Sequence, residues 1–465
     1  MSKQVGFVEP LLDSDQFSYG DADRTQRATD WGTDDADAVA PDVVVWPEST
    51  ADVAATVTAA NEHGVPVTPY AAGTSLEGNA VPVERGITLD LSRMDAVLDV
   101  RPDDLQVDVQ PGIFGDDLND AVAEHGLLLP SLPSSGAIST IGGMIANDAS
   151  GMKTVKYGEV ADWVLELEAV LPTGEVITTG SKAAKTSAGY NLKDLLVGSE
   201  GTLGVVTRAT IKLAGRPEEV RGGRAIFDSL EAAADAVTDA VQSGVDVAKI
   251  ELIDAFSAEV SNAFLDTELP DAPMVFVEFH ADHGVENEVA FCRSIFEAHD
   301  VQRFEVSDTD DEMRALWEAR RELAEAFEPY DRTLSPLTPG DITVPISNYT
   351  DIINYAKELG EKHDVPVACF GHAGDGNVHY FVMVDPEDPD SVADGETISA
   401  QLVERAIELG GTATGEHGIG MGKRDYLARE YNDATVDAMR AIKRALDPNG
   451  VLNPGKIFPE EESPQ

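Results

Sequence analysis

Two histidines bracket a run of turn-forming residues late in the chain. His372 precedes and His379 follows residues 373–378, which read Ala-Gly-Asp-Gly-Asn-Val. The flanking residues 367–370 and 380–384 are rich in β-branched and aromatic types, which predicts two strands joined by a hairpin. Cross-strand neighbours have Cβ atoms about 5 Å apart. We expect the two imidazoles roughly opposite each other, where they could bind one metal ion or merely form hydrogen bonds.

A second candidate lies in the glycine-rich stretch 415–420. Glu416 and His417 are adjacent there, so their side chains point to different places and two roles are natural. One could be a ligand and the other a base, although Glu416 could also be an ion-pair partner. A triphosphate-binding loop would need glycine at 417 and serine or threonine at 424. The chain has His417 and Arg424, which argues against that site.

A third candidate is an arginine on the apolar face of a predicted helix. The apolar residues at helical spacing are Met313, Leu316, Trp317, Ala324 and Phe327. Arg320 lies on that stripe, and an inward-facing guanidinium needs an anion. The anion could be a structural carboxylate or a substrate carboxylate held in bidentate geometry.

Three glycine-rich stretches in the first half of the chain could bind an extended ligand. They are residues 69–79, 133–151 and 198–207. Small side chains let backbone N–H groups approach a ligand, and successive N–H groups can hold a pyrophosphate. Residues 69–79 are not a Rossmann fingerprint, because no G-x-G-x-x-G opens the next helix. Each stretch alone could be an ordinary turn, but three in one domain favour a phosphate-containing ligand.

Apolar periodicity predicts the elements that position these residues. A βαβ-like pattern spans residues 43–68, and strands follow near 87–91, 107–109 and 164–180. Beyond residue 217, helices near 229–243, 284–298, 308–328 and 348–363 alternate with strands near 249–253, 274–280 and 303–306. We predict an N-terminal segment (1–37), a ligand-binding domain (38–216), a second domain with helices over an antiparallel sheet (217–434), and a C-terminal helix and tail (435–465) that return to the first domain.

The composition excludes several classes of function. The chain has 85 Asp and Glu residues against 33 Lys and Arg residues, a formal net charge of -52. This charge repels nucleic acid and anionic lipid, and its even spread is typical of a halophilic protein that is unstable at low salt. Two cysteines, Cys292 and Cys369, provide neither a disulfide framework nor a zinc set. With no apolar signal core and no long apolar run, we expect a cytoplasmic protein that reaches a membrane only through a partner.

The ordered motifs resemble those of a known family. The motifs are AAGTSLEGN (71–79), STIGGMIANDASG (139–151), GSEGTLGVVT (198–207), GHAGDGNVH (371–379), GEHGIG (415–420) and LNPGK (452–456). Together they resemble the FAD-linked oxidases of the vanillyl-alcohol-oxidase (PCMH) fold. The nearest branch contains D-lactate dehydrogenase, the glycolate oxidase flavin subunit and D-2-hydroxyglutarate dehydrogenase. The resemblance spans about residues 38–458.

The resemblance implies an α+β fold, with an FAD-binding domain of two α+β subdomains followed by an α+β cap domain whose antiparallel sheet is covered by helices. It places the FAD pyrophosphate at residues 71–79, and the absence of histidine from 69–79 implies non-covalent FAD. The implied FAD-binding residues are Ala71, Ala72, Gly73, Thr74, Ser75, Gly78, Asn79, Pro133, Ser139, Thr140, Gly142, Gly143, Asn147, Gly151, Glu200, Gly201, Val205, Val206 and Asn453.

The resemblance also assigns roles to the three candidates described first. His372, His379 and Glu416 would bind a divalent cation (Zn, Mn or Fe), His417 would be the general base, and Arg320 would bind the substrate carboxylate. Hydroxyglutarate-type members have a basic residue just before the strand that begins near Asp341. This chain has Pro339-Gly340 there, which favours a small monocarboxylate.

The implied activity is therefore oxidation of a small D-2-hydroxy acid, with D-lactate the best candidate. Electrons would leave to a quinone, a cytochrome or a separate iron–sulfur subunit, and the chain could form a homodimer. One alternative is the flavin subunit of a glycolate oxidase complex. A different class is a flavin-binding subunit without catalysis, which would have no need of the His372, His379, Glu416, His417 and Arg320 set.

Overall fold

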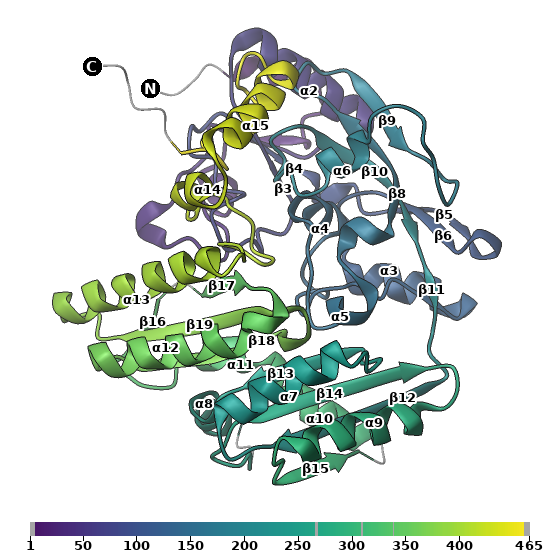
Figure 1. The fold of residues 1–465 in the computed structure, drawn as a ribbon. Helices are drawn as coiled ribbons and strands as arrows, with labels where there is room; N and C mark the ends of the chain where they lie inside the picture. Colours follow the sequence, from purple (N-terminus) through teal and green to yellow (C-terminus); the bar gives the residue numbers. More distant parts are fainter. Residues whose placement is uncertain (1–4, 266–267, 308–309, 338, 460–465) are drawn as a thin grey trace. The chain divides into compact units, whose positions relative to one another are not determined.

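The structure, a computed structural model, describes residues 5–265, 268–307, 310–337 and 339–459. The chain divides into two compact units (Figure 1). The first unit consists of Met1–Ser150, Glu159–Arg216 and Glu416–Gln465, and the second consists of Gly151–Gly158 and Pro217–Gly415. Each unit has its own sheets and its own buried apolar cluster.

A small sheet with a parallel centre begins the first unit. Its strand order is β1-β2-β4-β3, with β1 at Phe17–Ser18, β2 at Val43–Val45, β4 at Ile87–Asp90 and β3 at Val67–Tyr70. Helix α2 (Thr50–His63) connects β2 to β3. It begins because the Ser49 side chain accepts from the Asp52 N–H, and it ends because Gly64 takes a left-handed conformation at φ 61. Val53 and Val57 of this helix are fully buried against the sheet.

A second sheet of the first unit is antiparallel, with strand order β5-β6-β10-β8-β9. Its strands are β5 (Val97–Arg101), β6 (Gln106–Val109), β10 (Val205–Lys212), β8 (Val164–Val170) and β9 (Val176–Gly180). Strands β7 (Leu127–Leu128) and β11 (Ala214–Gly215) form a separate pair. Other helices of the unit are α1 (Asp21–Thr25), α3 (Gly115–Val122), α4 (Ile141–Asn147), α6 (Leu192–Leu196), α14 (Arg424–Glu430) and α15 (Asp433–Leu446).

The second unit is built on one large antiparallel sheet. The strand order is β15-β12-β14-β13-β18-β19-β16, and β17 also pairs with β19. The strands are β12 (Glu219–Ile226), β13 (Lys249–Ile253), β14 (Met274–Ala281), β15 (Arg303–Val306), β16 (Ser335–Pro336), β17 (Gly340–Thr343), β18 (Val367–Gly371) and β19 (Asn377–Val384).

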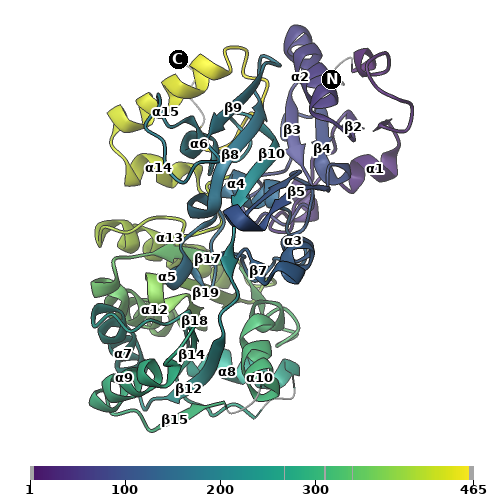
Figure 2. The same cartoon turned by 90° about the vertical axis from the view of Figure 1, so that its right-hand side faces the viewer.

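Helices cover both faces of this sheet (Figure 2). Helices α7 (Leu230–Gln242), α9 (Val285–Ala298), α12 (Tyr349–His363) and α13 (Pro389–Glu408) form one layer. Helices α8 (Ala255–Leu265), α10 (Asp310–Arg321) and α11 (Leu323–Ala326) lie on the other, where Trp317 and Phe327 join a buried cluster with Phe276 and Phe370. Helix α5 (Thr154–Tyr157) also belongs to this unit.

The structure confirms the α+β class and most of the predicted elements, with one correction. The helix expected near 308–328 is interrupted at Glu322, and residues 308–309 lie outside the described part of the chain. The Glu322 N–H still bonds to the Glu318 carbonyl at 3.1 Å, so the apolar face keeps its direction. Residues 151–158 belong to the second compact unit and residues 416–434 to the first.

Contacts within each unit explain this division. Tyr157 of α5 bonds through its hydroxyl to His280 Nδ1 on β14, at 2.8 Å. In the first unit, the backbone N–H groups of Ile419 and Gly420 donate to the Glu200 carboxylate.

Among the described residues, no helix is long and apolar enough to cross a membrane.

Candidate active site

The first glycine-rich stretch continues directly from β3 and is bonded to the N-terminal segment. Gly73 has φ +67, and a Cβ there would lie 2.2 Å from the Tyr70 hydroxyl oxygen, so a larger residue would not fit. The Trp31 N–H donates to the Gly73 carbonyl, and the Gly32 N–H donates to the Ser75 carbonyl. These two bonds involve backbone carbonyl oxygens of residues 73–75 and not their N–H groups. The N–H groups of this stretch can therefore donate to an anion.

The three glycine-rich stretches 69–79, 133–151 and 198–207 contribute residues to a cavity of about 240 Å³ within the first unit. Most of the residues predicted to bind FAD line it: Ala71, Ala72, Gly73, Thr74, Ser75, Asn79, Pro133, Ser139, Thr140, Gly142, Gly143, Asn147, Glu200 and Gly201. Glu416 and His417 also line it, although they lie more than 200 positions beyond Gly201 in the sequence. Three stretches that are remote in sequence therefore form one surface of small residues.

Other predicted FAD-binding residues are placed elsewhere. Gly78 packs against Met421, and Val205 and Val206 lie in β10 of the antiparallel sheet. Gly151 begins the short segment that belongs to the second unit. Asn453 is buried and donates to the carbonyls of Asn79 and Glu200, so it braces two of the cavity stretches.

Glu200 holds the Glu416–Gly420 stretch in the first unit. Its carboxylate accepts from Asn79 Nδ2 at 2.6 Å, from the Ile419 N–H at 2.7 Å and from the Gly420 N–H at 2.8 Å. Burial raises the pKa of Glu200, and these three donors oppose that effect. Gly418, at φ +81, has no room for a side chain beside Asn147. Glu200 thus supports the Glu–His pair as well as lining the cavity.

Glu416 and His417 are fixed at the cavity from the side of the first unit. The Glu416 carboxylate accepts from Ser150 Oγ at 3.3 Å, and its carbonyl accepts from Asn147 Nδ2 at 2.5 Å. His417 is 9% exposed, and its Nδ1 lies 4.0 Å from Glu77 Oε1. Lys423 lies 3.3 Å from the same Glu77 oxygen. A buried imidazole beside a carboxylate can hold a proton, as a base must.

The histidine hairpin in the second unit differs in register from the prediction. His379 pairs with Phe370 across β18 and β19, so His372 is a diagonal neighbour of His379 rather than its opposite. The reason is that the 3-10 turn Ala373–Asp375 starts directly after His372 and ends at Gly376, so the Asn377 N–H bonds to the His372 carbonyl and Asn377 takes the position opposite His372. The two rings still lie with centroids 5.0 Å apart and planes at 88°, and both histidines are at most 8% exposed.

A buried glutamate joins this pair to Arg320. Glu251 on β13 is fully buried, accepts from His372 Nδ1 at 2.8 Å and lies 2.6 Å from Arg320 Nη2. Burial alone would raise the pKa of Glu251, but its interactions with His372 and Arg320 outweigh burial and lower that pKa. Arg320 also stacks over the Phe370 ring at 5.0 Å. Its predicted inward orientation is confirmed, and the anion it contacts in the structure is a structural carboxylate.

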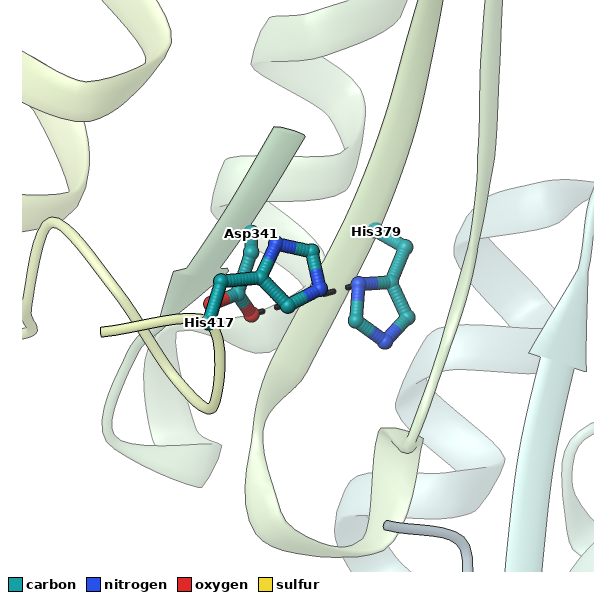
Figure 3. A group of neighbouring side chains, drawn as sticks. All are labelled: Asp341, His379 and His417. Carbon is teal, nitrogen blue, oxygen red and sulfur yellow. Dashed lines mark ion pairs between the residues drawn. The ribbon is translucent and has the colours of Figure 1, made fainter. Parts of the chain in front are cut away.

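A second buried carboxylate faces His379. Asp341 pairs with His379 across β17 and β19, and its Oδ1 lies 3.9 Å from His379 Nδ1 (Figure 3). The Asp341 oxygens accept from Asn377 Nδ2 at 2.7 Å, from the Gly415 N–H at 2.8 Å and from the Thr414 hydroxyl at 3.0 Å. Asp341 therefore fixes the backbone immediately before Glu416 in the sequence.

Sequence reasoning did not identify Glu251, Asp341 or Asp30 as site residues; Asp30 accepts from the Ser75 hydroxyl of the first glycine-rich stretch at 2.6 Å. Each is a carboxylate with neighbouring apolar or turn residues, and such positions are common in an acidic chain. For Glu251 a signal was present, because it is the central residue of the apolar strand Lys249–Ile253, whose five residues are all buried. A charge at such a position needs a buried partner.

Comparison with known proteins identifies the class to which this fold and cavity belong. The chain superposes on p-cresol methylhydroxylase with a TM-score of 0.79 at 19% identity, covering 97% of this chain and 96% of that one. It superposes on alkyldihydroxyacetonephosphate synthase with a TM-score of 0.75 at 21% identity, covering 96% of this chain and 83% of that one. At these identities the likeness concerns the fold, which is PCMH-like.

The family follows from the sequence comparisons. Residues 41–180 match the FAD binding domain and residues 216–457 match the C-terminal domain of FAD linked oxidases. The chain is 37% identical over 425 residues to the glycolate oxidase subunit GlcD of Bacillus subtilis (strain 168), covering 90% of each chain. It is 36% identical to a probable mitochondrial D-lactate dehydrogenase of Danio rerio, covering 90% of this chain and 84% of the relative. The chain belongs to the FAD-linked oxidase family.

The residues present fit FAD. The cavity wall is rich in glycine, alanine, serine and threonine and has few charged groups, and a Cβ at Gly73 or Gly142 would lie within 2.5 Å of a neighbouring atom. Such a wall admits a flat cofactor and offers backbone donors to its phosphates. The donor set of the second unit fits a divalent cation, because two neighbouring imidazoles have carboxylates beside their Nδ1 atoms.

Proposed function

We propose that the chain is an FAD-dependent dehydrogenase of small D-2-hydroxy acids, with D-lactate the preferred substrate and pyruvate the product. The observation that carries the proposal is a buried group in the second unit, in which His372 and His379 of the β18–β19 hairpin lie near Arg320 of helix α10. Two imidazoles suited to a cation beside a guanidinium suited to a carboxylate match the two functional groups of a 2-hydroxy acid. The curated relatives supply the substrate class, because they include D-lactate dehydrogenases and glycolate oxidase subunits.

In this proposal His372 and His379 provide cation ligands from the second unit, and Glu416 provides the third. Gly415, held to Asp341 by its N–H at 2.8 Å, is joined to Glu416 by a peptide bond. Glu416 is therefore the sequence neighbour of a residue bonded to Asp341, which pairs with His379. This neighbourhood supports its assignment as the third ligand. A bound FAD would supply the acceptor for the hydride from Cα, and a bound cation would supply a Lewis acid for the substrate hydroxyl.

The remaining roles belong to side chains. His417 takes the proton of the substrate hydroxyl, for which a buried imidazole that lines the cavity is suited. Arg320 binds the substrate carboxylate and so fixes the orientation of Cα. One observation supports this role beyond the pairing with Glu251: in the described part of the chain, Arg320 Nε is buried and has no hydrogen-bond partner. A buried donor without an acceptor is costly, and a bound carboxylate would supply the acceptor.

The preference for a monocarboxylate has its own support. A Cβ on Gly340 would lie 2.1 Å from the Tyr380 ring, so this position cannot bear the basic side chain that holds a distal carboxylate in hydroxyglutarate-type relatives.

A second candidate is the flavin subunit of a glycolate oxidase complex. The 37% identity to the Bacillus subtilis glycolate oxidase subunit favours it.

Anaerobic reduction of the flavin tests the proposal. The purified holoprotein, in molar KCl, is mixed separately with D-lactate, L-lactate, glycolate and D-2-hydroxyglutarate. We expect D-lactate to bleach the flavin absorbance fastest and hydroxyglutarate slowest. Bleaching by glycolate alone would favour the second candidate, and a flavin that stays oxidised with all four acids would contradict both.

A chelator arm addresses the cation. Dialysis against EDTA should remove most of the bleaching rate, and Zn²⁺ or Mn²⁺ should restore it. The matched control is a sham dialysis without EDTA, in which FAD content and rate should be unchanged. Full activity at a metal content near zero would contradict the metal site and leave the flavin assignment intact.

A further inference from the structure

The strand register of the second unit brings one carboxylate opposite a proposed cation ligand. Leu252 pairs with Gly371 and Ile253 pairs with Phe370 across β13 and β18. Continuing this antiparallel register by one step sets Glu251 opposite His372. Because side chains alternate along a strand, Glu251 and Ile253 share a face, and Ile253 joins the buried cluster that contains Trp317 of α10. Glu251 is thus directed toward the helix that carries Arg320.

Glu251 uses its two oxygens for two different partners. Oε1 accepts from His372 Nδ1 at 2.8 Å, and Oε2 lies 2.6 Å from Arg320 Nη2. The Glu251 side chain is 0% exposed and the Arg320 side chain 6% exposed. Removing one member of a buried ion pair leaves an uncompensated charge, so this geometry constrains both partners at once.

The contact with His372 determines which ring nitrogen is available. A carboxylate beside Nδ1 keeps the proton on Nδ1, so Nε2 retains its lone pair. That is the state in which an imidazole binds a metal ion, and carboxylate–histidine pairs of this kind fix the orientation of ligands in metal sites. The contact with Arg320 is an ion pair at 2.6 Å, but among the described residues neither Nη2 nor Nε of Arg320 has a hydrogen-bond partner. The guanidinium is therefore held by charge, and its N–H donors remain for a substrate.

We infer that Glu251 is a positioning residue that couples the two substrate-binding functions of the second unit. It sets the tautomer and orientation of His372 for the cation and holds Arg320 in place for the substrate carboxylate. This inference rests on the proposed function. Asp341 does not have the same role, because its distance to His379 Nδ1 is 3.9 Å and its oxygens are engaged by Asn377, Thr414 and Gly415.

The chain offers a closely matched control in Glu278. This glutamate lies on the adjacent strand β14, is 5% exposed, accepts from His280 Nε2 at 2.7 Å and lies 3.0 Å from Lys249 Nζ. It therefore has the same kinds of partners as Glu251, an imidazole and a cation, in the same sheet. Its described partners are His280 and Lys249, whereas those of Glu251 are His372 and Arg320. Glu278→Gln reports the general cost of neutralising a buried glutamate in this unit.

The experiment compares wild type, Glu251→Gln, Glu251→Asp and Glu278→Gln as full-length holoproteins in molar KCl. Affinity for Zn²⁺ or Mn²⁺ is measured by titration and elemental analysis, with FAD content, melting temperature, KM and kcat. We expect Glu251→Gln to lose metal affinity about 10- to 100-fold, the range for partners of metal ligands. Its KM for D-lactate should rise, and its FAD content should equal that of the wild type. Glu278→Gln should lower the melting temperature and leave metal affinity and KM unchanged.

Glu251→Asp retains the charge but shortens the reach, so it should bind metal with intermediate affinity and serves as the variant if Glu251→Gln does not fold. Suppose that the wild type binds the cation. If both Glu251 variants then have the same metal affinity and the same KM as the wild type, the positioning role is overturned and the proposed function stands. If Glu278→Gln loses metal to the same extent, the effect is general destabilisation and the inference also fails. A wild type that binds no divalent cation would instead overturn the proposed cation site, and the His372 role with it.

Discussion

The two units build their binding surfaces from different parts of the chain. In the first unit the cavity is lined by backbone and by small side chains, and its shape depends on glycines such as Gly73 that leave no room for a Cβ. In the second unit the candidate site consists of buried charged side chains on one sheet face, with Glu251 fully buried between His372 and Arg320. We therefore expect changes of volume to have the main effect on the backbone surface of the first unit, and changes of charge to have the main effect on the buried ionic side chains of the second.

The largest expected effect comes from removing a proposed ligand. His379→Ala removes one imidazole of the pair whose rings lie 5.0 Å apart. We expect metal affinity to fall more than about 100-fold, beyond the range for outer partners of ligands, while FAD content stays at the wild-type level. Elemental analysis and flavin absorbance measure the two quantities on one sample. His299→Ala is the control, because that histidine pairs with Asp239, away from His372 and His379. Equal metal content in the wild type and His379→Ala would refute the ligand assignment.

A charge change in the second unit should also have a large, pH-dependent effect on stability. Burial would raise the pKa of Glu278, but the hydrogen bond from His280 and the charge of Lys249 outweigh it and lower that pKa to about 2. Because the pKa is lower in the folded state, ionised Glu278 stabilises the folded protein. This stabilisation is fully present above the unfolded-state pKa near 4.5 and is lost as the pH falls toward about 2. The shift corresponds to roughly 3 kcal/mol.

Urea unfolding of the wild type and Glu278→Gln at pH 6, 5 and 4 measures this contribution. The difference in unfolding free energy between the two proteins should be largest at pH 6 and begin to narrow as the pH falls below 4.5. The control is Asp239→Gln, which neutralises a 54% exposed carboxylate paired with His299, and whose effect should be within about 0.5 kcal/mol. A Glu278→Gln difference that grew as the pH fell would contradict the sign of the shift.

Volume, rather than charge, should dominate in the first unit. Gly73→Ala adds a Cβ 2.2 Å from the Tyr70 hydroxyl oxygen at a residue with φ +67. We expect FAD affinity to fall about tenfold, because the loop must shift to relieve a left-handed alanine and a steric overlap. Gly410→Ala is the matched control, since Gly410 has φ +82 and no atom within 4 Å of its would-be Cβ. Fluorescence titration of apoprotein with FAD compares the two variants, and equal affinities would show that the loop does not shape the cofactor site.

The same contrast explains how much of the molecule could be predicted from its sequence. Periodicity located β13 at Lys249–Ile253 and helix α9 within a residue of its predicted start, because alternation and helical spacing are local properties. Small residues marked the cavity stretches for a similar reason, since close approach requires glycine at particular positions. The inward direction of Arg320 followed from its place on an apolar stripe.

Pairing between distant positions could not be predicted in this way. The turn begins at Ala373, directly after His372, and places His372 opposite Asn377 rather than His379. A one-residue shift in where a turn begins is invisible to strand propensity. Glu251 and Arg320 are 69 positions apart, and only the sheet order brings their strand and helix together. Residues 151–158 and 416–434 belong to their compact units because bonds to His280 and Glu200 hold them, not because of their composition.

The smallest predicted effect lies where a side chain supports the backbone surface. Asp30 is 6% exposed and accepts from the Ser75 hydroxyl at 2.6 Å and from the Ala80 N–H at 3.4 Å. It lies outside the residues 41–180 that match the FAD binding domain. Asp30→Asn keeps the volume and weakens these bonds, so the ordered loop should be populated less and FAD affinity should fall about fivefold. Because the loop geometry is also held by backbone bonds from Trp31 and Gly32, the loss should stay below that of Gly73→Ala.

Asp34→Asn provides the comparison, because Asp34 is exposed in the same segment. Its FAD affinity should equal that of the wild type in the same fluorescence titration, and metal content should be unchanged in both variants. If Asp30→Asn lowered FAD affinity more than Gly73→Ala, side-chain charge would control the first unit as it does the second, and the contrast between the two binding surfaces would fail. If it had no effect, the backbone bonds alone would suffice to order residues 73–75, which would sharpen the contrast further.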